Sequence, residues 1–491
     1  MYSLIPDQQC QRASRREWLR STRDSIGLLA LTSLLGREAI AFDDSRANRS
    51  VGGELPIRDD GGLHHAPKVK RVIQLFMNGG ASPMDTFDYK PALEKHHGES
   101  LGPKEKPEGF TAPAGAVMKS PFSFKQYGQS GRWVSEVFPH QALWVDKMSF
   151  IMSMASKTNV HGPGSYMMNT GFILPGFPCF GAWVSYALGN IADNLPTFVV
   201  LPDNRGLPYN QRANFSSGFL PAKHQGLVLD AAAVEPIPNL QPGKGFGFAG
   251  GNADVEGLEL LRRLNQSHAL NHREDSQFAS RLSAYELAAK MQLSAPEAFD
   301  LKSESEGTHR AYGLDQPATE DFGRRCLLAR RLVERGVRFV QVWSGPSGAA
   351  NNWDNHGSII GELPPIAKSV DQPIGALLGD LYSRGLMEDT LVVWTTEFGR
   401  TPFAQGSVGR DHNGGSFVSW FCGAGVKEGF AYGASDELGY QAVEGRCYCY
   451  DFHATLLHLL GVDHKRLTYR HAGIDRRLTD VHGRVVEDIL A

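Results

Sequence analysis

Four groups of polar residues stand where runs of apolar residues end, and their side chains are of the kinds that bind metal ions. The groups begin at Asn78, His161, Asp354 and Glu397. Imidazole nitrogens and carboxylate oxygens together hold divalent metals in proteins. We therefore expect a divalent-metal site and leave Zn²⁺, Ca²⁺, Mg²⁺ and Mn²⁺ open, with a site that holds no metal as the alternative.

The spacing within these groups suggests individual roles. Asp354 and His356 are two positions apart, so an extended chain points both side chains to the same side. Asp411 precedes His412 directly, which suits one ligand and one residue that orients it. The candidate metal ligands are Asp354, His356, His412, Glu397, Asn78, Asp85 and Asp411.

Four further residues are candidates for catalysis. His161 or Ser82 would act as nucleophile or base, and Arg400 or Arg410 would hold an anionic group of the substrate.

Each group also has a purely structural interpretation. Residues 354–356 precede a glycine and suit a turn held by side-chain hydrogen bonds. Residues 410–412 suit a surface ion pair, Glu397 suits a pair with Arg400, and Ser82 suits a helix cap. The coincidence of all the groups with strand ends is what favours a functional site.

The apolar runs before these groups have the length of buried parallel strands. Two units repeat the order helix, glycine, strand, which is typical of βαβ packing. Their helices are expected around 319–336 and 370–385, and Asp451 is expected to cap a later helix. The expected strands are 69–77, 148–154, 197–201, 337–343, 391–394 and 417–422.

These elements predict an α/β fold: a doubly wound, largely parallel sheet with helices on both faces. Residues 68–491 are expected to form one domain, with 203–275 as an insertion or cap. Ligands of such sheets bind outside the carboxyl ends of the strands, where the polar groups stand.

The N-terminal segment resembles an export signal. Arg15 and Arg16 precede an apolar stretch, 25–36, and small residues follow at 39–41. We expect a twin-arginine signal over 1–41, a linker over 42–67, and a protein exported to the periplasm or beyond the cell. An ordinary amphipathic helix is the alternative, and we expect no integral membrane segment once the signal is removed.

The overall charge excludes one class of partner. The 491 residues include 50 Lys plus Arg and 53 Asp plus Glu, a net charge of -3. A basic excess that would suggest nucleic acid is lacking. Small molecules or glycan esters are the expected partners.

Several motifs resemble a known family. Residues 68–491 resemble the domain of unknown function 1501 family (DUF1501), which is assigned to the alkaline-phosphatase-like superfamily together with sulfatases. The motifs are 78–82 with Asp85, 353–357, 397–402 and 409–412. The resemblance implies a doubly wound sheet with a site at the strand ends, but no established reaction.

The chain departs from the superfamily pattern at three positions. Asn78 stands where superfamily hydrolases usually have a metal-binding Asp, His161 where sulfatases have the nucleophile Cys, and Phe398 where a metal-binding His is usual. Asp354, His356 and His412 resemble the other metal position. The resemblance thus implies a single-metal hydrolase of phosphate or sulfate esters, or a non-catalytic member that binds a sulfated glycan or a protein.

Overall fold

The computed structural model describes residues 62–100, 113–233, 236–237, 256–257, 259–260, 263–265, 297–348 and 350–491. All of them fall within one compact unit, Gly53–Ala491. The expected export signal (1–41), most of the expected linker (42–67) and much of the expected insertion (203–275) lie outside the described residues.

A nine-stranded sheet forms the centre of this unit. Its strands are β1 (Arg71–Met77), β4 (Met148–Ala155), β5 (Phe198–Leu201), β6 (Leu227–Val228), β7 (Phe339–Ser344), β8 (Thr390–Thr395), β11 (Phe417–Gly423), β12 (Phe430–Tyr432) and β15 (Cys447–Tyr448). The spatial order is β12-β4-β11-β8-β1-β7-β5-β6, and β15 pairs with β4.

Most strand pairs of this sheet are parallel. β1 pairs in parallel with both β7 and β8, and the pairs of β5 with β6 and β7 are parallel too. Among the described strands of this sheet, β11 alone is antiparallel to its neighbours, β4 and β8. The expected largely parallel α/β sheet is confirmed.

Helices and small hairpins complete the described unit. The helices are α3 (Pro91–Lys95), α4 (His161–Thr170), α5 (Phe180–Leu188), α8 (Glu306–Ala311), α9 (Glu320–Glu334), α10 (Ile359–Ser383) and α11 (Cys449–Leu459). Short 3-10 helices are η2 (Pro83–Asp85), η3 (Gln141–Lys147), η4 (Gln211–Phe215), η5 (Ala222–His224), η6 (Leu301–Ser303), η7 (Leu386–Glu388) and η8 (Glu487–Ile489). The hairpin strands are β2 (Phe124–Tyr127), β3 (Arg132–Ser135), β9 (Gly399–Gln405), β10 (Gly409–Asn413), β13 (Ala434–Ser435), β14 (Ala442–Glu444), β16 (Tyr469–His471) and β17 (Ile474–Arg476).

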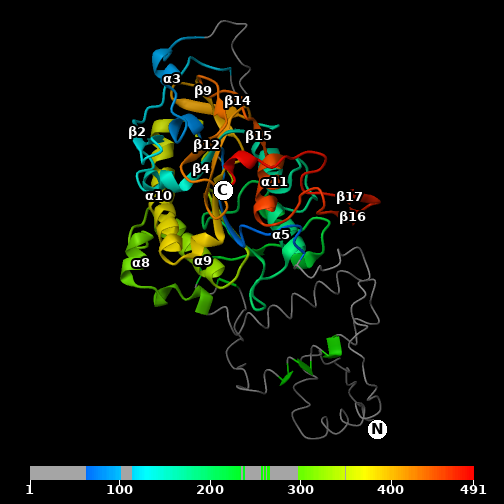
Figure 1. Cartoon of the computed structure of the whole chain (residues 1–491). Coiled ribbons are helices and arrows are strands. Elements are labelled where there is room, and N and C mark those ends of the chain that lie inside the picture. The colour runs from blue at the N-terminus through cyan, green and yellow to red at the C-terminus, as the bar shows by residue number, and fades with distance from the viewer. Residues whose placement is uncertain are drawn as a thin grey trace, which may run out of the picture. The chain divides into compact units, whose positions relative to one another are not determined.

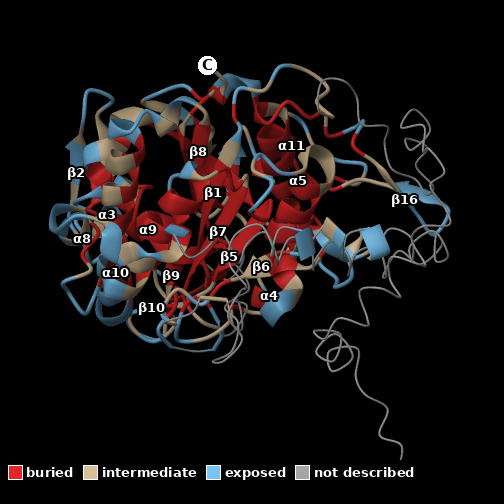
Figure 2. Ribbon diagram, turned by 90° about the horizontal axis from the view of Figure 1, so that it is seen from below, coloured by how far each residue is buried: buried red, intermediate tan, exposed pale blue. Residues whose placement is uncertain are grey.

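Two apolar cores lie on the two faces of the sheet. On β1, Ile73 and Leu75 belong to one core, together with residues of α9 and α10. Figure 1 shows α9 and α10 on one side of the unit and α5 and α11 on the other. Val72 and Phe76 point the other way and belong to a second core, with α5 and α11. Figure 2 shows the buried strands β1, β7 and β8 between these two pairs of helices. Burial on both faces explains why the inner strands are almost continuously apolar.

The strand directions bring distant segments to one edge of the sheet. β1, β4, β7 and β8 run the same way, because β4 and β8 are both antiparallel to β11. Their carboxyl ends therefore lie along the same edge. The segments that follow them, which begin at Asn78, Ser156, Gly345 and Thr396, form the loops of that edge.

Two helices differ from the sequence expectation. α10 begins at Ile359, well before 370, because Ser358 caps it by accepting a hydrogen bond from the amide of Gly361. Pro364 and Pro365 lie inside α10, near its exposed side, where water can reach the carbonyls that lose a helical donor. Asp451 is not the cap of α11 but its third residue, and its carboxylate accepts the backbone N–H of Tyr448.

None of the helices in the described part of the chain has the length and apolar character needed to cross a membrane.

Candidate metal centre

Four side chains from three separate segments meet at the carboxyl edge of the sheet. His161 is the first residue of α4, which follows β4, and Asp354 and His356 lie in the loop between β7 and α10. His412 comes from β10, opposite Arg400 in the β9–β10 hairpin. One nitrogen or oxygen from each of His161, Asp354, His356 and His412 lies within 4.8 Å of the others.

The four donor atoms are spaced as ligands of a single ion would be. Asp354 Oδ1 is 3.1 Å from His161 Nε2, 2.8 Å from His356 Nε2 and 3.2 Å from His412 Nε2. The Nε2 atoms of His356 and His412 are 2.8 Å apart. Ligands at about 2.0–2.1 Å from a tetrahedral ion are roughly 3.3 Å apart. The cluster is thus a slightly contracted version of a four-ligand site.

Each imidazole has its other ring nitrogen bonded to an oxygen. His161 Nδ1 is 2.8 Å from Glu397 Oε1, and His412 Nδ1 is 2.6 Å from the carbonyl oxygen of Asn159. His356 Nδ1 pairs with the side-chain oxygen of Gln405. These oxygens can only accept, so each Nδ1 carries the proton, and in the neutral imidazole each Nε2 presents a lone pair. Metal-binding histidines are oriented in this way.

This protonation pattern places lone pairs at the centre of the cluster, where Arg400 Nη2, 2.5 Å from Asp354 Oδ1, supplies a positive charge. With both Nδ1 atoms donating, the facing Nε2 atoms of His356 and His412 bear lone pairs that repel. His161 Nε2 is buried and has no hydrogen-bond partner among the described residues, because its approach to Asp354 lacks hydrogen-bond alignment. A buried polar atom without a partner is costly. A divalent cation would satisfy all these atoms, so the residues present fit such an ion.

The electrostatic surroundings favour the ligand forms of Asp354 and His412, but they favour the protonated form of His161. Burial opposes ionisation of Asp354, but the adjacent imidazoles of His161, His356 and His412 and the charge of Arg400 hold its pKa well below the ordinary value. Burial lowers the pKa of His412 to about 4, so this imidazole is neutral at neutral pH. Burial also lowers the pKa of His161, but contacts with Asp354 and Glu397 outweigh it and leave that pKa raised.

Two aromatic rings wall the cluster. Tyr209 stacks on His161 with ring centroids 4.3 Å apart and an interplanar angle of 5°. Phe398 lies 4.9 Å from the rings of both His161 and His412. Phe398 therefore packs against the histidines as a wall, in the place where the superfamily resemblance would put another metal-binding imidazole.

The two arginines that were candidates for anion binding are buried, and their guanidinium groups are already bound to carboxylates and carbonyls of the protein. Arg400 Nη2 is 2.5 Å from Asp354 Oδ1, and Arg400 Nε donates to the carbonyl of Gly80 at 2.8 Å. Arg410 Nε is 2.5 Å from Asp85 Oδ2, and Arg410 Nη2 is 3.1 Å from Asp85 Oδ1. Both guanidinium groups also donate to further backbone carbonyls. They fasten the loops that carry the cluster.

The other candidates lie beside the cluster rather than in it. Ser82 Oγ donates to Asp85 Oδ2 at 2.5 Å. The amide nitrogen of Asn78 donates to two carbonyls that follow β7. Asp411 Oδ1 accepts the backbone N–H of His412 at 2.8 Å, which supports the strand that presents His412. None of these three belongs to the four-donor group found among the described residues.

Of the four donor residues, Asp354 alone lines a neighbouring cavity of about 300 Å³. Arg205 lines it and is 40% exposed, with Nε and Nη2 each 2.7 Å from an oxygen of Asp203. His356 is the most exposed of the four donors, at 27%. Arg205, Tyr209, Gln405 and Asn159 belong to none of the motifs that the sequence offers, although Gln405 ends β9 and Asn159 follows β4.

Comparisons with known proteins agree with the motifs. A family model described as "Protein of unknown function (DUF1501)" matches residues 69–490. No curated protein matches the chain significantly.

Several solved structures resemble the chain in fold at low identity. The lipoteichoic acid synthase LtaP from Listeria monocytogenes is 9% identical, with 83% of this chain and 75% of that chain covered and a TM-score of 0.37. An alkaline phosphatase from the Antarctic bacterium TAB5 is 11% identical, with 82% and 99% covered and a TM-score of 0.31. The PsFucS1 sulfatase from Pseudoalteromonas sp. is 13% identical, with 80% and 68% covered and a TM-score of 0.34.

Proposed function

The chain belongs to the DUF1501 family, and from that premise we propose that it is an exported, metal-dependent hydrolase of phosphate or sulfate esters. The observation that carries the proposal is the orientation of three imidazoles. Each has Nδ1 bonded to an oxygen and Nε2 directed at one carboxylate oxygen of Asp354. That arrangement is typical of ligands held ready for a metal ion.

A catalytic site must keep one coordination position open for the substrate. We therefore assign the ion to Asp354, His356 and His412, and a base role to His161. A divalent ion bound there would supply a Lewis acid that polarises the ester. Glu397 holds the His161 ring so that Nε2 faces the same point, where it can accept a proton from the attacking group.

The anionic part of the substrate needs a cation, and Arg205 is the best placed. Arg400 and Arg410 are fully buried. Arg205 lines the cavity that Asp354 also lines, and its bonds to Asp203 use Nε and Nη2. Its remaining nitrogen, Nη1, is available to an oxyanion.

The non-catalytic alternative is favoured by one specific observation. The donor group contains four side chains, and a metal with four protein ligands forms a closed, structural site. If His161 is the fourth ligand, the centre would stabilise the loops and the chain would bind a sulfated glycan or a protein without turnover.

One variant separates these two functions. The wild type, His161→Ala and His412→Ala would be compared for bound metal and for hydrolysis of p-nitrophenyl phosphate and sulfate, with and without chelator. His482→Ala, at an exposed histidine, is the control. The hydrolase proposal expects His161→Ala to keep its metal and lose turnover, and His412→Ala to lose both. Loss of metal from His161→Ala, or a wild type without turnover on either ester, would contradict it.

Export is part of the proposal and rests on the N-terminal sequence alone. Arg15 and Arg16 precede an apolar stretch and small residues at 39–41. Replacement of both arginines by lysine should keep the chain inside the cell. An extracytoplasmic protein that retains its N-terminus would contradict cleavage near Ala41.

A further inference from the structure

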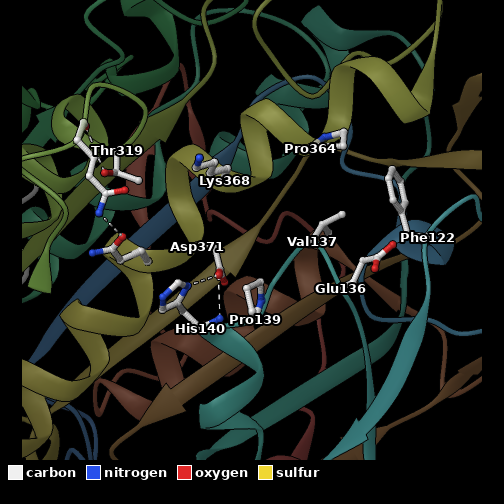
Figure 3. Close-up of a pocket in the computed structure, with 11 residues that line it drawn as sticks. Phe122, Glu136, Val137, Pro139, His140, Thr319, Pro364, Lys368 and Asp371 are labelled. Carbon is white, nitrogen blue, oxygen red and sulfur yellow. Dashed lines mark hydrogen bonds and ion pairs between the residues drawn. The ribbon is translucent and has the colours of Figure 1, made fainter.

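A second cavity, of about 520 Å³, lies beside α10 and away from the histidine cluster (Figure 3). Its volume is within the roughly 300–1,000 Å³ of small-molecule sites. Figure 3 shows Phe122, Val137 and Pro364 at one end, together with Glu136, and His140 with Asp371 at the other. The first end is therefore mostly apolar, with Glu136 as its charged residue, and the second end is polar.

The polar end is built around a buried carboxylate. Asp371 is almost completely buried, and it accepts hydrogen bonds from the backbone amides of His140 and Gln141 at 2.8 and 2.9 Å. His140 Nδ1 is 2.7 Å from the same carboxylate. Because Asp371 accepts at Nδ1, the imidazole is fixed in orientation while its side chain stays 51% exposed.

Most other polar groups of the cavity are already satisfied within the protein. Glu136 accepts two hydrogen bonds from Ser123. Thr319 donates to the carbonyl of Gly313, and the amide nitrogen of Gln372 donates to two carbonyls. These groups need no ligand.

Two nitrogen groups of the cavity differ from these. The ammonium of Lys368 and Nε2 of His140 have no hydrogen-bond or ion-pair partner among the residues that the structure describes. Lys368 stands one helical turn before Asp371 and Gln372, so all three share the face of α10 that lines the cavity. Lys368 and His140 are thus the cation and the imidazole of the cavity that remain open to a ligand.

From this distribution we propose that the cavity is a binding site for a small amphipathic organic anion. Its carboxylate or other oxyanion lies between Lys368 and His140, which the buried Asp371 positions. Its apolar body lies against Phe122, Val137 and Pro364. The site is independent of the metal centre, because no residue of the four-donor group lines the cavity.

The test uses two probes of one shape that differ in charge: naphthalene carboxylate and naphthalene carboxamide. Binding to the full chain would be measured by calorimetry. We expect the carboxylate to bind more tightly than the amide. Lys368→Met should weaken the carboxylate about tenfold, as loss of a charge-assisted hydrogen bond does, and should leave the amide unchanged. His140→Ala should act in the same direction.

The controls distinguish this site from general effects. Lys302→Met removes an exposed lysine on another element and should change nothing. Lys368 and His140 are exposed at the side chain, so thermal melting should show folded variants. Equal binding of the two probes, or carboxylate binding unaffected by Lys368→Met, would overturn the proposal. Carboxylate binding that disappears in His412→Ala would place the anion at the metal centre and would also overturn it.

Discussion

Replacement of Glu397 by glutamine tests whether the metal centre depends on the group behind its ligands. Glu397 is completely buried, and its Oε1 accepts both His161 Nδ1 and the amide of Gly79 at 2.8 Å. The amide oxygen of glutamine can still accept these bonds, so the geometry should persist. Glutamine lacks the negative charge of Glu397. That charge makes Nε2 of His161 a stronger electron-pair donor to a metal ion or a proton.

The expected effect is moderate and measurable. Loss of such a partner behind a metal-binding histidine typically costs about 10–100-fold in metal affinity or activity. That corresponds to about 1.4–2.7 kcal/mol. If His161 is a ligand, the cost should appear in metal affinity. If His161 is a base, it should appear in turnover while metal affinity changes little.

The assay is a competition for metal against a chelator of known affinity, run beside turnover on the p-nitrophenyl esters. Glu444→Gln, which removes an exposed carboxylate on β14, is the control and should match the wild type. A Glu397→Gln protein that is folded and unchanged in both metal affinity and turnover would refute the reasoning, since the contact with His161 would then have no consequence.

Three further outcomes follow from other contacts. Burial lowers the pKa of His453 to about 4, against about 6.5 in an unfolded chain. The neutral His453 therefore contributes up to about 3 kcal/mol to the free energy of unfolding above pH 6.5, and this contribution is lost as pH falls towards 4. Urea titrations at a series of pH values should show the loss. The loss should be smaller in His453→Leu. Arg410→Met leaves the charge of the buried Asp85 unpaired and should lower the free energy of unfolding by about 3–5 kcal/mol. An unchanged free energy in chemical denaturation would contradict this. Gly409→Ala would place a Cβ 1.7 Å from the carbonyl oxygen of His356, so it should lower metal content; unchanged metal content would mean that this contact does not hold His356.

The sequence predicts much of the sheet and the convergence of the strand-end residues. Asp354, His356 and Glu397 follow strands that are mostly apolar because both of their faces are buried. Such runs end visibly, and parallel strands bring their carboxyl ends to one edge. His161 and His412 belong to the same four-donor group as Asp354 and His356. Their roles remain predictions.

The sequence does not reveal which charged residues are already satisfied. Arg400 and Arg410 look like anion-binding residues in a motif, yet both are buried and bound to carboxylates and carbonyls. Whether an arginine is free to bind an anion depends on which carboxylates and carbonyls lie near it in the folded chain. Gln405, the last residue of β9, and Tyr209 also contact the histidines. Neither residue belongs to a motif, so the sequence does not identify them as part of the site.

The position of β1 in the sheet has a consequence for the synthesis of the chain. β1 begins at Arg71, but the strands on either side of it begin at Phe339 and Thr390. At roughly 5–20 residues per second, the ribosome delivers the first partner on the order of half a minute later. During that interval an apolar strand has both edges unpaired, which invites association with other chains. The nascent protein should therefore need a chaperone until β8 has emerged, and chains truncated before β8 should aggregate.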